Sequence, residues 1–200
     1  MSRSLYLVVA FTALTLLLSL AVAAPPSTLT PGTKAPSFTL NDVNGKSHSL
    51  NDYSSSKYVA LIFIATRCPV SNAYNERMVK LNDDYTSKGI TFLGINSNSQ
   101  EGIEEVKDHA GKNGFSFTVL KDPNNIVADA YGATVTPEVY VIDSKGTVRY
   151  HGRIDNSRDS DEISSQDLRT ALDTLLSGKE VAKADTKAFG CSIKRVKKQS

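Results

Sequence analysis

The sequence predicts an α/β domain with a central mixed sheet flanked by helices. Val59–Ala65 is an unbroken apolar run, too short to span a membrane, and is typical of a strand buried on both faces. The residues that follow it repeat at the spacing of one helix face: Tyr74, Met78, Leu81 and Tyr85. A second apolar run, Ile90–Ile95, comes next. Strand, helix and strand in this order form a right-handed parallel crossover.

Further elements are predicted on both sides of this crossover. An Asn44-Gly45 turn separates two short alternating segments, Ser37–Leu40 and Lys46–Leu50, which indicates an N-terminal β-hairpin. The remaining elements, in chain order, are a helix marked by Ile103, Val106 and Ala110, an extended piece over Phe115–Leu120, a short helix through Ala130, a hairpin of Val139–Ile142 with Thr147–Ile154, and a closing helix striped by Leu168, Ala171, Leu172, Leu175 and Leu176.

Cys68 lies where the first buried strand changes into the helix, and Pro69 suits the first helical position. A helix N-terminus offers unpaired N–H groups and the positive end of the macrodipole, and both favour thiolate over thiol. Such sites lower a cysteine pKa from about 8.5 to roughly 3.5–7.5. Arg67 adds to the effect if its side chain turns toward the sulfur, and Ser71 offers a hydroxyl donor. The alternative is a buried, unreactive Cys68 beside an ordinary first-turn serine.

The chain divides into a signal peptide, a linker, a domain and a tail, at residues 1–23, 24–34, 35–178 and 179–200. The first segment has a positive start, an apolar middle and an Ala-x-Ala end, which predicts cleavage near Ala23. An uncleaved anchor is the alternative. We therefore expect a secreted or periplasmic protein with no membrane attachment after cleavage. Disulfides persist in those compartments, and the polar tail carries Cys191.

Composition excludes several classes of function. A formal net charge of +2 is too small to indicate nucleic-acid binding, and 40% hydrophobic residues suffice for a core. The cysteines number only 2 and the histidines 3, and none of them has the spacing of a zinc site. No nicotinamide, flavin or metal motif is visible, so we expect no cofactor. The two cysteines can form one bridge that closes a very long loop.

Two short motifs carry a resemblance to a known fold. Cys68-Pro-Val-Ser71 resembles the Cys-x-x-Cys motif of thioredoxins with its second cysteine replaced. Thr136-Pro137 resembles the cis-proline position of the same fold. The resemblance implies a thioredoxin-like domain in which Pro137 is cis, faces Cys68 and contacts the substrate. From the residues alone, a trans proline that starts a strand is the alternative.

The longer match, from about Pro31 to Lys194, is to the redoxin group of the alkyl hydroperoxide reductase and thiol-specific antioxidant family. More narrowly, the chain is similar to the peroxiredoxin-like 1 subgroup. The motifs that carry this match are Ala65–Ser71, Gly94–Asn98, Thr136–Asp143, Gly152–Asp155 and Lys187–Lys194. The chain departs from true peroxiredoxins at Ala65 and Leu61, where those enzymes carry a hydroxyl residue and a proline.

In a thioredoxin-like topology, several segments end at the same edge of the sheet as Cys68, because parallel strands share their carboxyl edge. Arg153 is a candidate to stabilise the thiolate or an oxyanion, with an exposed strand-end charge as its alternative. Thr66, Asn96 and Glu138 are further candidates for activating the thiol or contacting the substrate.

These observations predict an exported thiol oxidoreductase. Cys68 attacks a peroxide or a disulfide, Cys191 resolves the product, and an external thiol donor resets the enzyme. Alternatively, Cys191 forms a static bridge or stays unpaired. The chain as a whole can instead be a binding module whose cysteines are structural. A metal chaperone is a weaker alternative, because two soft ligands make a poor site.

Overall fold

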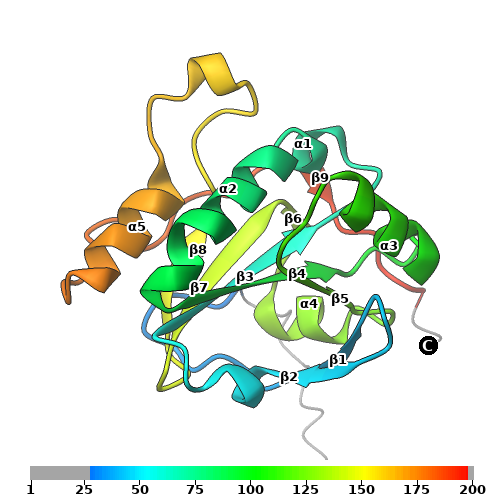
Figure 1. Cartoon of the computed structure of the whole chain (residues 1–200), viewed down its shortest axis with the longest axis horizontal. Coiled ribbons are helices and arrows are strands. Elements are labelled where there is room, and N and C mark those ends of the chain that lie inside the picture. The colour runs from blue at the N-terminus through cyan, green and yellow to red at the C-terminus, as the bar shows by residue number, and fades with distance from the viewer. Residues whose placement is uncertain (1–27, 198–200) are drawn as a thin grey trace, which may run out of the picture.

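A mixed sheet runs through the centre of the computed structural model, which describes residues 28–197 (Figure 1). Its strands are β1 (Thr39–Asp42), β2 (Ser47–Ser49), β3 (Tyr58–Ile64), β4 (Ile90–Asn96), β5 (Thr118–Lys121), β7 (Glu138–Asp143) and β8 (Val148–Gly152). They lie in the order β2-β1-β5-β4-β3-β7-β8. Strand β4 is parallel to β3 and β5, whereas β7 is antiparallel to β3. The predicted crossover and N-terminal hairpin are confirmed.

Helices cover both faces of this sheet (Figure 1). They are α1 (Pro69–Asn72), α2 (Asn75–Tyr85), α3 (Ile103–Lys112), α4 (Ile126–Tyr131) and α5 (Asp167–Leu176), with short 3-10 turns η1 (Leu50–Tyr53), η2 (Thr86–Lys88) and η3 (Ser160–Glu162). Buried side chains of α2, α3 and α5 join one hydrophobic cluster, and those of α4 join a second. Among residues 28–197, none of these helices has the length and apolar character needed to cross a bilayer. The predicted signal peptide, residues 1–23, lies outside the described residues.

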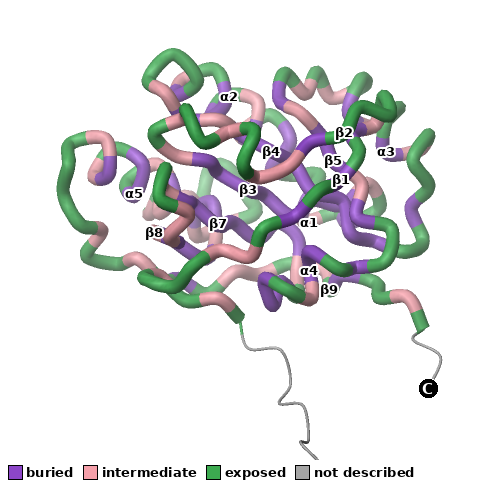
Figure 2. Tube along the Cα trace, turned by 90° about the horizontal axis from the view of Figure 1, so that it is seen from below, coloured by how far each residue is buried: buried purple, intermediate pink, exposed green. Residues whose placement is uncertain are grey.

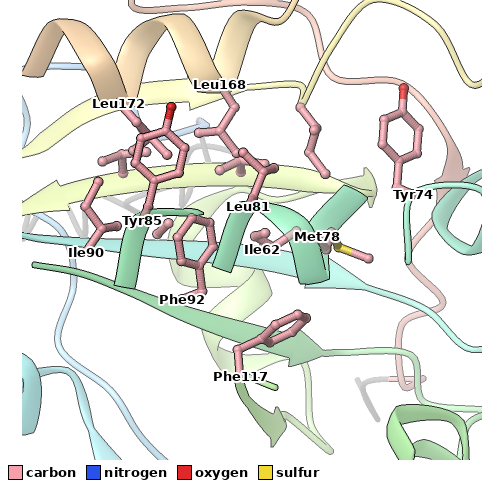
Figure 3. Close-up of a cluster of buried hydrophobic side chains, with 14 of the residues drawn as sticks. Ile62, Tyr74, Met78, Leu81, Tyr85, Ile90, Phe92, Phe117, Leu168 and Leu172 are labelled. Carbon is pink, nitrogen blue, oxygen red and sulfur yellow. The ribbon is translucent and has the colours of Figure 1, made fainter. Parts of the chain in front are cut away.

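Strand β3 is buried on both faces, as its apolar run predicts. Its side chains alternate between the two clusters, with Ile62 in one and Phe63 in the other. Figure 3 shows Leu81 and Tyr85 of α2 between Leu168 of α5 and the strands. Buried residues accordingly concentrate along the strands in Figure 2, while loops and outer helix faces are exposed. Double-sided burial explains why β3 lacks the apolar–polar alternation of a half-exposed strand.

The helix that follows Cys68 is broken, whereas the sequence predicts a continuous one. The backbone N–H of Tyr74 donates to the carbonyl of Ser71, a tighter pairing than the α-helical one, and α2 begins afresh at Asn75. At the break, the Tyr74 hydroxyl donates to Asp155 Oδ1, with an O–O distance of 2.9 Å. A tertiary hydrogen bond therefore accompanies the interruption.

The predicted linker and the predicted tail are packed against the domain where the structure describes them. In the linker, the N–H of Gly32 donates to the carbonyl of Val148. In the tail, residues 184–196 form a strap that crosses the carboxyl edge of the sheet, beginning with a 2.8 Å hydrogen bond from His151 N–H to the carbonyl of Ala184. A two-stranded sheet joins β6 (Val135–Thr136) to β9 (Cys191–Ser192) within this strap. Backbone pairing of this kind leaves no apolar periodicity in the sequence.

Candidate active site

Cys68 occupies the N-cap of α1, as the sequence predicts. Its backbone is extended, Pro69 is the first residue of α1, and the Ser71 N–H donates to the sulfur over 3.2 Å. The side chain is buried, with the residue 3% exposed. Because α1 spans only 4 residues, this individual N–H group matters more for the thiolate than a long macrodipole.

The second cysteine lies beside the first. Register places Cys191 of β9 opposite Thr136 of β6, and the Thr136 carbonyl accepts a hydrogen bond from the Cys68 thiol at 3.5 Å. Both cysteines are unpaired and line one cavity of about 80 Å³. Residues 123 positions apart, from 68 to 191, therefore meet at one point.

The two thiols titrate unequally. Burial opposes ionisation of Cys68, but the donors around its thiolate, namely the Cys191 thiol, the Ser71 N–H and the Thr136 side chain, together hold the pKa of Cys68 below its ordinary value. The hydrogen bond to Cys68, together with burial, raises the pKa of Cys191. Cys68 therefore loses its proton first, while Cys191 remains a thiol that donates to it.

Thr136 is a site residue that the sequence did not single out beyond its place before a proline. It is 1% exposed, and its hydroxyl has no hydrogen-bond partner among the described residues. The interaction of this side chain with the sulfur favours the thiolate and lowers the pKa of Cys68 after burial has raised it. A buried hydroxyl without a partner is costly, and ionisation of Cys68 relieves that cost because it gives the Thr136 hydroxyl an anionic acceptor.

We expect the alkylation of Cys68 to report this network directly. In the wild type, the rate of iodoacetamide reaction at Cys68 should rise with a midpoint below about 8.5, the usual cysteine pKa. Cys191→Ala removes a donor to the thiolate, so the midpoint should move upward. Cys191→Ser is the matched control, because its hydroxyl still donates. Identical midpoints in the alanine and serine variants would contradict the assignment of Cys191 as a donor.

The proline loop adjoins the same sulfur. The Thr136–Pro137 peptide bond is cis, which confirms the expectation drawn from the fold resemblance. Glu138 follows it and is buried, with its Oε2 accepting from the N–H groups of Thr134 at 2.8 Å and Val135 at 3.1 Å. Glu138 therefore fixes the backbone of the loop and of β6 through these two hydrogen bonds. Its carboxylate does not line the cysteine cavity.

His151 links this buried carboxylate to the strap. Its Nε2 lies 2.9 Å from Glu138 Oε1, and its Nδ1 lies 2.9 Å from Asp185 Oδ1. Burial lowers the pKa of His151, but the two carboxylates outweigh burial and raise it above the ordinary value. Burial likewise raises the pKa of Glu138, and hydrogen bonds from His151 and the loop amides bring it below the ordinary value. A charged His151 thus bridges β7 and the strap through two ion pairs.

Arg67 and Thr66 contact acidic side chains from α3 and the segment before it. The Arg67 guanidinium forms two hydrogen bonds with Glu105, at 2.7 and 2.6 Å, and Thr66 Oγ1 donates to the same carboxylate. Hydrogen bonds from Arg67 and Thr66 lower the pKa of Glu105 to about 2. The expected turn of Arg67 toward the sulfur is replaced by this ion pair, so its charge is engaged elsewhere.

Glu101 is a second residue that the sequence analysis missed. It is 4% exposed, and its carboxylate accepts from the N–H groups of Thr66 at 2.9 Å and Arg67 at 3.0 Å. Asn96, at the end of β4, also donates to it, over 2.5 Å. Glu101 thereby fixes the loop that leads into Cys68. An acidic residue before a helix ordinarily indicates a solvated cap, so nothing in the sequence singles it out.

Two predicted site residues have different surroundings from those expected. Arg153 is not among the residues that line the cysteine cavity, and its guanidinium pairs with Asp167 of α5 at 2.9 Å. The reason is that β8 ends at Gly152 and the chain then meets α5, where the N–H of Leu168 donates to the carbonyl of Ile154. The Ser71 hydroxyl is buried and accepts from the N–H of Ala65 at 3.2 Å, so it braces the loop, while its N–H contacts the sulfur.

The described residues contain no group of three or more His, Cys, Asp or Glu side chains placed to hold a metal ion. The cysteine pair is instead surrounded by hydrogen-bond donors, by the cis-proline loop and by the strap. This arrangement suits thiol chemistry, because it stabilises one thiolate and holds a second thiol against it.

Comparison with known proteins identifies the family. The AhpC/TSA family matches residues 31–151. The chain belongs to this family. The Mycobacterium tuberculosis protein named "Putative peroxiredoxin MT2597" is 31% identical to this AhpC/TSA member over 124 residues, which cover 60% of this chain and 75% of the relative. The thiol-disulfide oxidoreductase ResA of Geobacillus thermodenitrificans is 32% identical over 118 residues, covering 59% of this chain and 66% of ResA.

Solved structures give the same assignment for the fold. A hypothetical protein from Sinorhizobium meliloti superposes with a TM-score of 0.80 at 33% identity, over 86% of this chain and 98% of its own. Peroxidoxin BcpB from Mycobacterium tuberculosis shares the fold, with a TM-score of 0.57 at 19% identity over 75% of this chain and 95% of its own. This AhpC/TSA member is therefore a thioredoxin-like redoxin and a thiol oxidoreductase, as the sequence predicts.

Proposed function

We propose that this redoxin is an exported oxidoreductase in which Cys68 is the nucleophile and Cys191 is the resolving thiol. The observation that carries the proposal is that both cysteines line one small cavity, where Cys191 pairs in register with Thr136, the residue whose carbonyl accepts from the Cys68 thiol. Cys68, whose pKa is lowered, accepts a hydrogen bond from an N–H at the start of α1. Cys191, whose pKa is raised, lies in the strap.

The first step uses the Cys68 thiolate. With a hydroperoxide, the sulfur attacks one oxygen, the O–O bond breaks, and a sulfenic acid forms while the alcohol or water leaves with a proton from solvent. With a disulfide, the sulfur attacks one sulfur atom, the S–S bond breaks, and a mixed disulfide forms while a thiol leaves. The N–H of Ser71 and the hydroxyl of Thr136 stabilise the anion before attack.

Resolution uses Cys191. Its sulfur attacks the Cys68 sulfur, forms the Cys68–Cys191 bond, and expels water from the sulfenic acid or a thiol from the mixed disulfide. The proton of Cys191 leaves with that group. An external thiol donor then reduces the bond and restores two thiols. Since Cys191 lines the same cavity as Cys68, we expect this step to need no large movement of the chain.

Export is part of the proposal. A positively charged start, an apolar segment and an Ala-x-Ala end support a cleaved signal peptide over residues 1–23. A secreted or periplasmic location also suits an enzyme whose product is a disulfide, because oxidising compartments allow disulfides to persist.

Non-reducing peptide mapping tests the pairing. Reduced protein treated with one equivalent of hydrogen peroxide or diamide should yield a peptide that joins Cys68 to Cys191, and dithiothreitol should release both halves. With hydrogen peroxide, Cys191→Ser should instead trap a sulfenic acid at Cys68, detectable with dimedone. Two free, unmodified thiols after oxidation of the wild type would refute the proposed roles.

A further inference from the structure

The strap lies on a strand edge that is otherwise open for pairing. In the described structure, β6 has β9 as its partner in a two-stranded sheet that is separate from the main sheet. The register joins Val135 to Ser192 and Thr136 to Cys191, and the N–H of Ile193 donates to the carbonyl of Thr134 at 2.9 Å. Without the strap, these backbone groups would form an exposed edge, which is a template for an added strand.

The backbone of the strap approaches this edge closely enough to exclude side chains. Gly190 has φ +153°, and a Cβ atom placed on it would overlap the carbonyl oxygen of Thr136. Only glycine therefore permits this contact. Figure 1 shows β9 lying against β6 and α1, and Cys68 is the N-cap of α1.

Side chains on both flanks of β9 hold the strap in place. On one side, the Phe189 ring packs edge-on against Tyr74, with centroids 6.4 Å apart. On the other, Ile193 is 6% exposed in the hydrophobic cluster of α4. The N–H of Lys194 then donates to Asn98 Oδ1 at 2.8 Å. The strap is thus an ordered peptide with its own hydrogen bonds and two apolar anchors.

The strap restricts access to Cys68. The cysteine is 3% exposed, and the cavity that contains it, about 80 Å³, is walled in part by Cys191, Ser192 and Lys194. A space of this size holds a few water-sized groups. An extended polypeptide that carries a disulfide can bind by adding a strand to an open edge, and here β9 already occupies the β6 edge.

We propose that the strap is a built-in occupant of the β6 edge and selects substrates by size. Small oxidants reach Cys68 with the strap in place, whereas polypeptide disulfides must first displace it. The inference rests on the proposed function, since it assigns a substrate class to the Cys68 thiolate. It makes Gly190 a residue that determines specificity without taking part in the chemistry.

The test compares a small and a peptide disulfide in the full chain carrying Cys191→Ser, where the Cys68 adduct persists. The small reagent is 2-hydroxyethyl disulfide. The peptide reagent copies Lys187–Lys194, with its cysteine joined to 2-mercaptoethanol. In each case the Cys68 thiolate breaks the S–S bond, forms a mixed disulfide and releases a thiol, which mass spectrometry follows over time. A scrambled peptide serves as the reagent control.

Adding Gly190→Ala should displace β9 and accelerate the peptide reaction at least about tenfold, as expected for freeing two or three backbone hydrogen bonds. The reaction with the small disulfide should change less than about threefold, since it does not need the edge. Gly178→Ala is the matched control, because Gly178 also has a positive φ but open space around it. Phe189→Ala, which loosens the strap without a backbone clash, replaces Gly190→Ala if circular dichroism shows that variant unfolded.

A binding measurement separates this inference from the proposed function. A fluorescent Lys187–Lys194 peptide with serine in place of its cysteine should bind the Gly190→Ala/Cys191→Ser chain and not the Cys191→Ser chain. Two results would overturn the proposed role of the strap. One is that Gly190→Ala leaves the ratio of the peptide-disulfide rate to the small-disulfide rate unchanged. The other is that the fluorescent peptide binds equally to the chains with and without Gly190→Ala. A Cys68 that reacts with neither disulfide, in a chain that binds the peptide as expected, refutes the proposed function and leaves the strap assignment standing.

Discussion

Replacing Cys68 with serine should reduce turnover of hydrogen peroxide and of 2-hydroxyethyl disulfide, with a dithiol as reductant, by at least about 1,000-fold. A serine hydroxyl is not ionised near neutral pH, so neither the Ser71 N–H nor the Thr136 hydroxyl has an anion to stabilise. Steady-state consumption of each oxidant measures the loss. Wild-type rates in a folded Cys68→Ser protein would refute the assignment of the nucleophile.

Cys191→Ser is the matched control for this experiment. It should retain one fast reaction per molecule at Cys68, because the nucleophile is intact, and then lose repeated turnover unless the external thiol resolves the intermediate. Single-turnover mass spectrometry separates the two variants. The contrast between a missing first step and a missing second step distinguishes the nucleophile from the resolving thiol.

Replacing His151 with leucine should destabilise the fold by about 3 kcal/mol, because it removes the partner of a buried charge. Glu138, at 3% exposure, would keep its hydrogen bonds from the loop amides but lose the imidazolium. Urea unfolding measures the change. Asp185→Asn is the control, since its side chain is 56% exposed and should cost less than about 1 kcal/mol. Equal effects of both substitutions would contradict this assignment.

The raised pKa of His151 also makes the stability of the fold depend on pH. The folded pKa of His151 lies above its unfolded value of about 6.5. Its contribution is therefore complete below that pH and is lost as pH rises through the folded pKa. The wild type should lose stability over that range, and His151→Leu should lose less. A wild-type stability that increases with pH through neutrality would contradict the raised pKa.

Much of the fold follows from local patterns in the sequence. Val59–Ala65 predicts a strand covered on both sides, and the order of an apolar run, a helical pattern and a second apolar run predicts a parallel crossover. These predictions succeed because burial sets the spacing of apolar residues along each strand and helix. Position also identifies Cys68, since a cysteine between a buried strand and Pro69 must cap a helix. The cis state of Pro137 followed from resemblance to a fold, because a proline alone permits both isomers.

Long-range polar contacts could not be predicted in the same way. Glu101 contacts the loop before Cys68 through backbone N–H groups, and Arg67 pairs with Glu105 instead of turning to the sulfur. Each partner lies more than thirty positions away. A contact between charged residues so far apart in the chain leaves no periodic pattern in the sequence. The sequence therefore predicted the neighbouring Cys68 sulfur, and not Glu105, as the partner of Arg67.

The sequence by itself determined the α/β fold, the capped cysteine and the presence of a second thiol, because hydrophobic periodicity and capping are local properties of the chain. Only the tertiary structure decided that Cys191 lies against Cys68 and that the tail is a strap. Backbone hydrogen bonds between β6 and β9 place it there, and they depend on a glycine contact across more than fifty residues.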